Sequence, residues 1–307
     1  MPREISSIPT ALGTRFGRTE ESPIVGPEHS GIDRPREILI LPVHRPHHAK
    51  PETVVSPSTP KQPPAAPARS PVLSLSTVRF RIKEKPELMV GYKTGDIKHI
   101  KNVSIWVNSE NTDMLMDRFI GKSVSAQIRY LGSNKDDDGN VIEDTIAEAL
   151  RTAVGARGRV RVGTVLVTES GSLRATHRVH RVFHVAIVES APGATMRARK
   201  ENLVPCIGAL LDRAERVNKS IWKIIFKMKA HESILIPMMG TGEGGLLVED
   251  VAETVIRAAI DHLLGEQLPT LKEVYFLAYT ARDKEACDHV LEQCCENGIL
   301  VRFDEKS

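Results

Sequence analysis

The sequence predicts an α/β fold of three layers, in which helices cover both faces of a mixed, largely parallel sheet. Short segments rich in β-branched and aromatic residues alternate with amphipathic helical patterns from residue 73 onward, and such alternation is typical of α/β domains. Several of these segments are apolar on both faces, as strands buried between two layers of helices are. No internal repeat is visible in the sequence.

The first 72 residues differ in composition from the rest of the chain. Of the 19 prolines, 14 lie before Val72, where short apolar pieces such as EILILPV are separated by Pro, Ser, His and charged residues. A segment of this kind has too little apolar surface to offset the entropy lost on folding. We therefore expect residues 1–72 to be a disordered, proline-rich segment and linker on which a protein partner could dock. Residues 73–307 are expected to form one folded domain.

Six segments are predicted as strands. Residues 78–85 alternate apolar and charged side chains, which predicts an amphipathic strand at a sheet edge. The other five are short and rich in β-branched or aromatic residues, and they are 103–108, 163–169, 182–189, 233–238 and 273–279.

Five helical patterns lie between the strands, at residues 113–131, 142–154, 202–219, 248–264 and 284–296. The pattern at 248–264 is the clearest, because its apolar residues recur at i, i+3 and i+4 and so share one face. In sheets of this class, ligands bind in the loops beyond the carboxyl ends of the strands. Polar and glycine-rich stretches in those loops are therefore the site candidates.

Charge and cysteine content exclude several classes of protein. A formal net charge of +3 over 307 residues argues against a binder that depends on neutralising many phosphates. The four cysteines form no CxxC pair and have no histidine at metal spacing, so we expect reduced thiols and no metal site. No signal-peptide pattern follows the first Met and no run reaches about 18 apolar residues, so a cytoplasmic location is expected.

The glycine-rich stretch MGTGEGG, residues 239–245, lies between an apolar strand and a helix. Backbone N–H groups and the positive end of a helix dipole meet at such a place and suit an anion, above all phosphate. Glycine lets the backbone approach the ligand closely. The alternative is a turn that holds no ligand.

The same stretch satisfies GxGxxG through Gly240, Gly242 and Gly245. That dinucleotide-binding pattern belongs to the first strand and helix of its fold and needs an acidic residue about 20 positions later, at the end of the next strand. Here the residue at that distance, Asp261, falls inside the predicted helix. A Walker loop is excluded because no Lys-Ser or Lys-Thr follows the glycines.

Two earlier stretches carry polar residues at suitable places. TGDIKHI puts Asp96 in a turn, and VNSEN puts Asn108 and Asn111 at the end of a strand. A carboxylate accepts from an exocyclic amino group such as that of adenine, while an asparagine both donates to and accepts from ribose hydroxyls. Taken singly, these residues are equally consistent with turn residues and helix caps.

Together and in this order, the motifs resemble the macro domain, an ADP-ribose-binding module. In that family a GDI turn precedes a strand ending in VNAAN, and a late strand leads into GTGxxG and a helix. This chain has GDI at 95–97, VNSEN at 107–111 and IPMMGTGEGG at 236–245. The resemblance spans about residues 75–293 and implies ADP-ribose or a related NAD-derived nucleotide as ligand, with no cofactor.

The resemblance also implies roles for individual residues. Asp96 would accept from the adenine amino group, Ile97 would line the adenine pocket, and Asn108 and Asn111 would lie near the distal ribose. The two loops would supply the remaining ligand-binding residues, which are Gly121, Ser123 and Val124 in the first loop and Gly240, Thr241, Gly242, Glu243 and Gly244 around the diphosphate.

Departures from the family pattern bear on catalysis. The first loop has Lys122 and Ser123 where glycines are usual, and Ser125 where hydrolytic members carry an Asp. A serine cannot act as a carboxylate base. Hydrolysis of an ADP-ribosyl or O-acetyl-ADP-ribose bond stays an alternative, with Asn108 or Asn111 orienting water and Glu243 as the base.

Two basic clusters lie at residues 155–163 and 174–184. The alternation in RVRV predicts arginines on a solvated strand face. The alternative is a contact surface for nucleic acid or poly-ADP-ribose that uses Arg159 and Arg161. The histidines of the second cluster have no partners at metal spacing.

Overall fold

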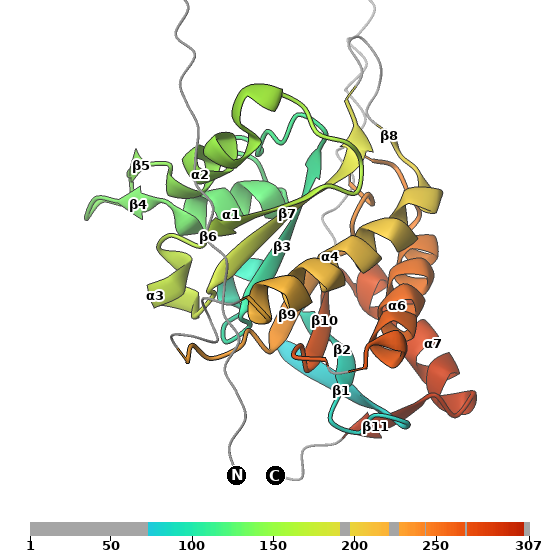
Figure 1. Cartoon of the computed structure of the whole chain (residues 1–307). Helices are drawn as coiled ribbons and strands as arrows, with labels where there is room; N and C mark the ends of the chain where they lie inside the picture. Colours follow the sequence, from blue (N-terminus) through green and yellow to red (C-terminus); the bar gives the residue numbers. More distant parts are fainter. Residues whose placement is uncertain (1–72, 191–196, 221–226, 243, 268, 304–307) are drawn as a thin grey trace, which may run out of the picture. The chain divides into compact units, whose positions relative to one another are not determined.

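The computed structural model describes residues 73–190, 197–220, 227–242, 244–267 and 269–303. The segment 1–72, for which disorder is predicted, lies outside these residues. Element labels follow Figure 1.

One sheet of nine strands forms the middle of the described part. Its order is β11-β1-β2-β10-β9-β3-β7-β6, with β8 also paired to β7. Strands β2, β10, β9, β3 and β7 run parallel, whereas β1, β6, β8 and β11 pair antiparallel to their neighbours. The bounds are β1 Ser76–Ile82, β2 Met89–Thr94, β3 Ile105–Asn111, β6 Val165–Glu169, β7 Arg181–Glu189, β8 Arg197–Ala198, β9 Ser233–Pro237, β10 Glu273–Ala278 and β11 Leu300–Phe303. The carboxyl ends of these five parallel strands therefore lie on the same side of the sheet.

Helices cover both faces of the sheet (Figure 1). Helices α1, α2 and α3 pack on one face and α4, α6 and α7 on the other. Their bounds are α1 Val124–Gly132, α2 Thr145–Val154, α3 Leu173–His177, α4 Leu203–Asn218, α6 Val248–Gly265 and α7 Ala281–Glu296. Short elements complete the description, namely the hairpin β4 Asn134–Lys135 and β5 Val141–Glu143, and the 3-10 turns η1 Ile97–His99, η2 Gly155–Arg157 and η3 Lys200–Asn202. The predicted three-layer α/β fold with a mixed sheet is confirmed.

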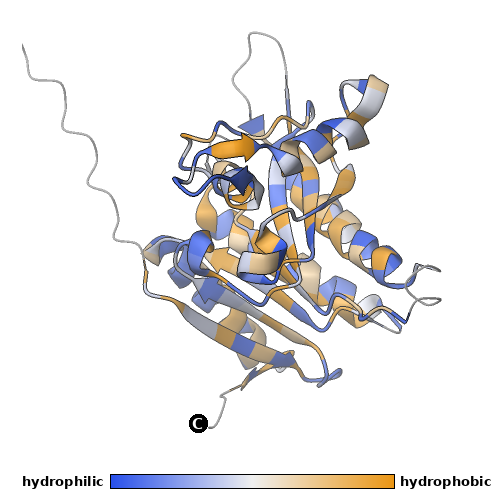
Figure 2. Cartoon of the chain, turned by 90° about the vertical axis from the view of Figure 1, so that its left-hand side faces the viewer, coloured by the Kyte–Doolittle hydropathy of each residue, from blue (hydrophilic) through white to orange (hydrophobic). Residues whose placement is uncertain are grey.

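Each face of the sheet has its own apolar core. Neighbouring residues on one strand alternate between the two, so that Val107 belongs to the core under α4, α6 and α7 while Trp106 belongs to the core under α1, α2 and α3. Figure 2 shows hydrophobic and hydrophilic residues mixed along the helices, as expected for helices that bury only one face. No helix in the described part of the chain is long and apolar enough to cross a membrane.

The predicted edge position of residues 78–85 is wrong. Strand β1 lies between β2 and β11, and β11 forms the edge. The arginines of β1 contact aromatic residues. Arg79 Nε donates to the Tyr275 hydroxyl at 2.7 Å, and the Arg81 guanidinium lies over the Phe303 ring. An alternating strand with arginines therefore does not have to be an edge strand. The sequence patterns also missed β2 and β11.

The predicted helix at residues 113–131 begins only at Val124. Asn111 Oδ1 accepts from the Asp113 backbone N–H at 2.9 Å and closes a turn, and Met114 has the left-handed φ of 53°. Ser123 is the N-cap of α1 in extended geometry. Residues 112–123 thus form a loop, and this loop follows the carboxyl end of β3.

The predicted strand face in RVRV is also wrong, because residues 158–164 are irregular and β6 begins at Val165. The backbone N–H of Val160 donates to Thr112 O at 2.8 Å, and that of Gly163 donates to Ala186 O at 2.8 Å. These bonds join the segment to the ends of β3 and β7 and leave Arg161 exposed.

Candidate nucleotide-binding cavity

A cavity of about 830 Å³ lies where the parallel strands end. Its floor comes from the last residues of β3, β7, β9 and β10, for example Glu110, Val188, Pro237 and Leu277. The 112–123 loop, the start of α1 and the glycine-rich loop after β9 form its walls. The cavity therefore lies at the carboxyl ends of the strands, where α/β sheets commonly bind ligands.

Seven of the residues predicted for the site line this cavity together. They come from the end of β3, from the start of α1 and from the glycine-rich loop, and they are Asn111, Ser123, Val124, Gly240, Thr241, Gly242 and Gly244. The loops are more than 100 residues apart in the chain, and the parallel arrangement of β3 and β9 brings them to the same side.

Asp96 and Ile97 do not line the cavity. The Asp96 carboxylate accepts from the Lys98 backbone N–H at 3.1 Å and lies 3.2 Å from Lys98 Nζ. Ile97 is buried in the core under α1. Both follow Gly95, whose N–H donates to Ala278 O at 3.1 Å, so they lie beside the end of β10, where Tyr279 does line the cavity.

Two other predicted residues, Asn108 and Gly121, stand apart from the lining. Asn108 is fully buried beneath the cavity. Gly121 donates its N–H to Arg118 O at 2.8 Å, and a Cβ there would collide with the Asp117 carboxylate. Glu243 lies outside the described residues.

The glycine-rich loop presents free amides to the cavity. Its shape is held by bonds from Leu246 N to Gly240 O at 3.0 Å and from Gly245 N to Gly242 O at 3.1 Å. No backbone bond among the described residues uses the N–H groups of Thr241, Gly242 or Gly244. A Cβ on Gly242 would meet no atom within 4 Å, so the backbone there is open to a ligand.

Hydrogen bonds of its own side chains hold the shape of the first loop. Ser123 Oγ accepts from the Ala126 backbone N–H at 3.1 Å and donates to Asp117 Oδ2 at 2.6 Å. Arg118 and Lys122 line the cavity and are exposed, and neither forms an ion pair among the described residues. The substituted loop thus offers one cation, Lys122, where the family pattern has glycine, and Arg118 adds a second cation shortly before it.

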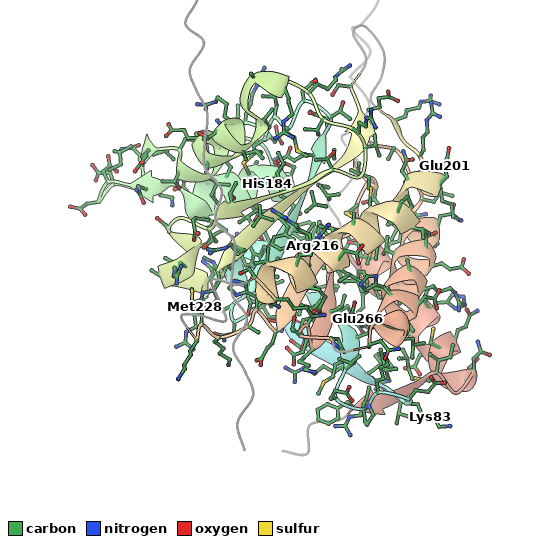
Figure 3. All side chains as sticks on the ribbon, in the orientation of Figure 1. Lys83, His184, Glu201, Arg216, Met228 and Glu266 are labelled. Carbon is green, nitrogen blue, oxygen red and sulfur yellow. The ribbon has the colours of Figure 1, made fainter. Side chains whose placement is uncertain are left out.

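A cluster of buried polar side chains lies under the cavity between β3, β7, β6 and α1. Asn108 Nδ2 donates to Glu110 Oε1 and lies 3.3 Å from Ser125 Oγ and 3.4 Å from His184 Nδ1. His184 Nε2 lies 3.1 Å from Thr168 Oγ1. Figure 3 labels His184 on β7, which lies between β3 and β6 in the sheet. Glu110 and Ser125 also line the cavity, so the cluster reaches the ligand space.

Sequence reasoning missed Glu110 and Tyr279. Glu110 occupies the fourth position of VNSEN, where the family pattern VNAAN has alanine, and that difference was a usable signal. Tyr279 is 38% exposed at the end of β10, and no local pattern distinguishes it from a core aromatic residue.

Asp283 also lines the cavity, but its carboxylate is already occupied. Its Oδ2 accepts from the backbone N–H groups of Thr280 at 2.8 Å and Tyr279 at 3.1 Å, and Thr280 Oγ1 accepts in return from the Asp283 N–H. This capping box begins α7, so Asp283 has a structural role at the rim.

A second hollow of about 460 Å³ is lined by Thr112, which follows Asn111 in the chain, and by residues 159–162. Its charges are mixed, with Arg159, Arg161 and Arg199 beside Glu189 and Glu201. Arg159 is paired with Asp113 at 2.9 Å, and the hydrogen bond from its guanidinium holds the pKa of Asp113 below its usual range. The arginines therefore do not form a purely positive surface.

Metal-binding and disulfide chemistry find little support in the described residues. No group of three or more His, Cys, Asp and Glu there could hold a metal ion. The cysteines Cys206, Cys287, Cys294 and Cys295 are free.

Comparisons with known proteins agree with the motifs. Residues 107–255 match the family model of the macro domain. The fold matches the Oceanobacillus iheyensis macrodomain with ADP at 17% sequence identity and a TM-score of 0.52, over 73% of this chain and 100% of that chain. A mutant of that macrodomain with ADPR matches at 17% identity and a TM-score of 0.52, over 72% and 100%. A search of curated proteins finds no match.

The matched range begins at VNSEN and includes both loops of the cavity. It does not include the GDI turn at 95–97, but the similarity in fold extends over a larger part of the chain. The motifs, the family model and the fold agree: residues 107–255 match the macro domain family, and the fold is similar to that of a macrodomain.

Proposed function

We propose that the cavity binds ADP-ribose or a related NAD-derived nucleotide, either free or as an ADP-ribosyl mark on a macromolecule. The observation that carries this proposal is that Thr241, Gly242 and Gly244 line the same cavity as Asn111, while their backbone N–H groups have no backbone acceptor among the described residues. Free N–H groups on a loop that a ligand can approach closely suit a diphosphate. The complexes of the O. iheyensis macrodomain with ADP and with ADPR support this choice of ligand.

We propose a position for each part of the ligand. The diphosphate lies on the glycine-rich loop, with Arg118 and Lys122 supplying positive charge from the opposite wall. The distal ribose lies at Asn111, whose amide both donates and accepts. The adenine lies toward Tyr279, which lines the cavity, and Asp96 lies beyond the lining with its carboxylate bonded to Lys98.

Isothermal titration of the full-length chain with ADP-ribose tests the proposal, and chromatography of the same mixture shows whether the ligand is unchanged. We expect saturation near one equivalent. Gly242→Ala adds a methyl group to the open backbone and is expected to weaken binding about tenfold, because a Cβ hinders close approach of the phosphate. Gly208→Ala, on α4 and also in open space, is the matched control. Equal affinities of both variants would count against the glycine loop as the phosphate site.

Asp96→Ala tests the place of the adenine. The exposed fraction of this side chain is 13%, so it is reachable but already bonded to Lys98. We expect weaker ADP-ribose binding with a smaller loss for ribose 5-phosphate, which has no adenine. An equal loss for both compounds would show that Asp96 acts on the shape of the loop instead.

Hydrolysis of an ADP-ribosyl or O-acyl-ADP-ribose bond is the second candidate function. Glu110 favours it, because this glutamate brings a carboxylate to the cavity although Ser125 stands at the family's Asp position. The roles of Asn108, Asn111 and Glu243 in catalysis stay predictions, and Asn111→Ala is expected to abolish product release if Asn111 orients water.

The partners of the protein and its location in the cell are also proposals. An ADP-ribosylated macromolecule is the proposed partner, and docking of a protein on residues 1–72 and a cytoplasmic location stay predictions. Binding of nucleic acid or poly-ADP-ribose through Arg159 and Arg161 predicts an affinity that falls steeply with salt. The mixed charges of the second hollow argue against it.

A further inference from the structure

Glu110 is a buried carboxylate at the wall of the cavity. Its exposed fraction is 4%, and it points to the same face of β3 as Asn108, two positions earlier. Its Oε1 accepts from Asn108 Nδ2, lies 3.5 Å from Ser125 Oγ and lies 3.6 Å from His184 Nδ1. No hydrogen bond among the described residues involves its Oε2. One oxygen is therefore held by the protein, and the other is available to the cavity.

This environment is unusual for a carboxylate with only a structural role. Burying a carboxylate is unfavourable unless several donors compensate. Glu215, which is 6% exposed, shows such compensation, since it accepts from two backbone N–H groups and a hydroxyl and lies 3.3 Å from Lys219 Nζ. Glu110 has one amide donor and a hydroxyl at the limit of bonding distance.

His184 has contacts at both ring nitrogens. Its Nδ1 faces the Asn108 amide group, which is a donor, and its Nε2 faces the Thr168 hydroxyl, which can accept. A neutral imidazole with its proton on Nε2 satisfies both contacts. In this tautomer His184 donates to Thr168 and not to the Glu110 carboxylate, which lies 3.6 Å from Nδ1.

Binding alone does not explain Glu110 either. The ligand proposed above is a diphosphate, and a buried carboxylate in the same cavity repels it. A carboxylate oxygen that borders a cavity and has no hydrogen bond from the described residues is placed to accept a proton from a water molecule in that cavity.

We propose that Glu110 is a general base of the cavity, which accepts a proton from a water molecule that attacks an acyl ester on a ribose of bound ADP-ribose. The role of the missing Asp at position 125 is thereby taken by a carboxylate from the neighbouring strand, 3.5 Å from the Ser125 hydroxyl. This inference rests on the proposed function, because the ester must be held by the nucleotide cavity.

The reaction is a hydrolysis in which the atoms balance. As the water oxygen attacks the ester carbonyl carbon, one hydrogen of the water passes to Glu110. The bond between the carbonyl carbon and the ribose oxygen then breaks, and the ribose oxygen takes this hydrogen from Glu110. The products are ADP-ribose and the carboxylic acid, and Glu110 returns as a carboxylate. General bases contribute typically ~10²–10⁴-fold to rates.

The experiment measures turnover of O-acetyl-ADP-ribose and binding of ADP-ribose by the full-length chain and by two variants. Glu110→Gln keeps an acceptor for Asn108 but removes the base, so we expect kcat to fall about 100-fold or more while ADP-ribose binds at least as tightly. Glu215→Gln is the matched control, a buried glutamate outside the cavity, and we expect its kcat to be unchanged in the folded protein.

The outcomes separate this inference from the proposed function. Turnover by the wild type that Glu110→Gln abolishes, with binding retained, supports the inference. Binding of ADP-ribose without turnover by the wild type overturns it and leaves the proposed function intact, as does equal turnover by wild type and Glu110→Gln. Absence of binding to the wild type overturns both. Circular dichroism of each variant shows that it is folded, and Glu110→Asp replaces Glu110→Gln if the latter does not fold, with the same large loss expected because the shorter side chain withdraws the oxygen.

Discussion

Glu110 and Glu215 are two buried glutamates on opposite sides of the same sheet, and their surroundings differ in one respect. Glu215 ties the end of α4 to the chain before β10, through the backbone N–H groups of Thr270 and Leu271 and through Lys219. Glu110 has few donors and borders a cavity. A buried charge whose donors come from the backbone stabilises the fold, whereas one left partly unpaired at a cavity is available to a ligand.

Removal of Glu215 is expected to have the largest effect on stability. Glu215→Ala leaves the N–H groups of Thr270 and Leu271 without their acceptor, and we expect the free energy of unfolding to fall by about 3 kcal/mol. Glu110→Gln should cost less than about 1 kcal/mol, because its one strong donor keeps an acceptor. Urea unfolding of both variants measures this difference. A cost for Glu110→Gln as large as that for Glu215→Ala would make Glu110 a structural residue and erase the contrast.

Moving the carboxylate from β3 to α1 tests whether a carboxylate at position 125 can replace Glu110. Glu110→Ala should lose O-acetyl-ADP-ribose turnover about 100-fold, and adding Ser125→Asp to it should restore about tenfold of that loss, since position 125 borders the same space. Steady-state kinetics of the single and double variants provide the measurement. A double variant that folds, binds ADP-ribose and is no more active than Glu110→Ala would show that the place of the carboxylate is not what limits the reaction.

The acid dependence of stability should depend on Glu215. Burial raises its pKa, but the bonds from Leu271, from Thr270 and from Lys219 outweigh burial and hold the pKa below its ordinary value. Because the folded-state pKa is the lower one, the stabilisation is complete above the unfolded-state pKa and is lost as pH falls through the folded-state pKa. The wild type should therefore lose stability on acidification below the ordinary glutamate range more steeply than Glu215→Gln does. Thermal unfolding between pH 7 and pH 3 compares the slopes, and parallel curves would contradict the assignment.

The capping box at the rim of the cavity should have the smallest effect. Thr280→Ala removes the acceptor of the Asp283 N–H and should lower the free energy of unfolding by about 1 kcal/mol. Asp283 keeps its bonds to the backbone of residues 279 and 280, so ADP-ribose binding should be unchanged within about twofold. Urea unfolding and calorimetry report the two effects separately. A marked change in binding would place Thr280, which also lines the cavity, among the ligand contacts as well as among the caps.

Much of the fold was predictable because local patterns and tertiary structure agree. The predicted helix at 248–264 matches α6 at Val248–Gly265, since its apolar residues recur with the helical period and face one core. Predicted strands at 182–189, 233–238 and 273–279 match β7, β9 and β10 within a residue or so. The failures fall where side chains override pattern, as in the loop at 112–123, where Asn111 closes a turn that the helical period does not reveal.

The candidate site was predictable only in part. The motifs that resemble the macro domain identified seven residues that line the cavity. Glu110 was missed because its significance depends on neighbours far along the chain. Asn108 and His184 are partners in the register of β3 and β7, and Ser125 reaches Glu110 from a helix.

The sequence by itself determined the α/β class, the order of the motifs and the loop that turns at Gly240, whose φ of +83° favours glycine. These properties follow from the period of apolar residues and from the conformational freedom of single residues, which are local. Only the tertiary structure decided that a carboxylate on β3, a hydroxyl on α1 and an imidazole on β7 share one buried space beside the cavity. That arrangement depends on strand register and on helix packing, which are set by the fit of side chains from the whole domain.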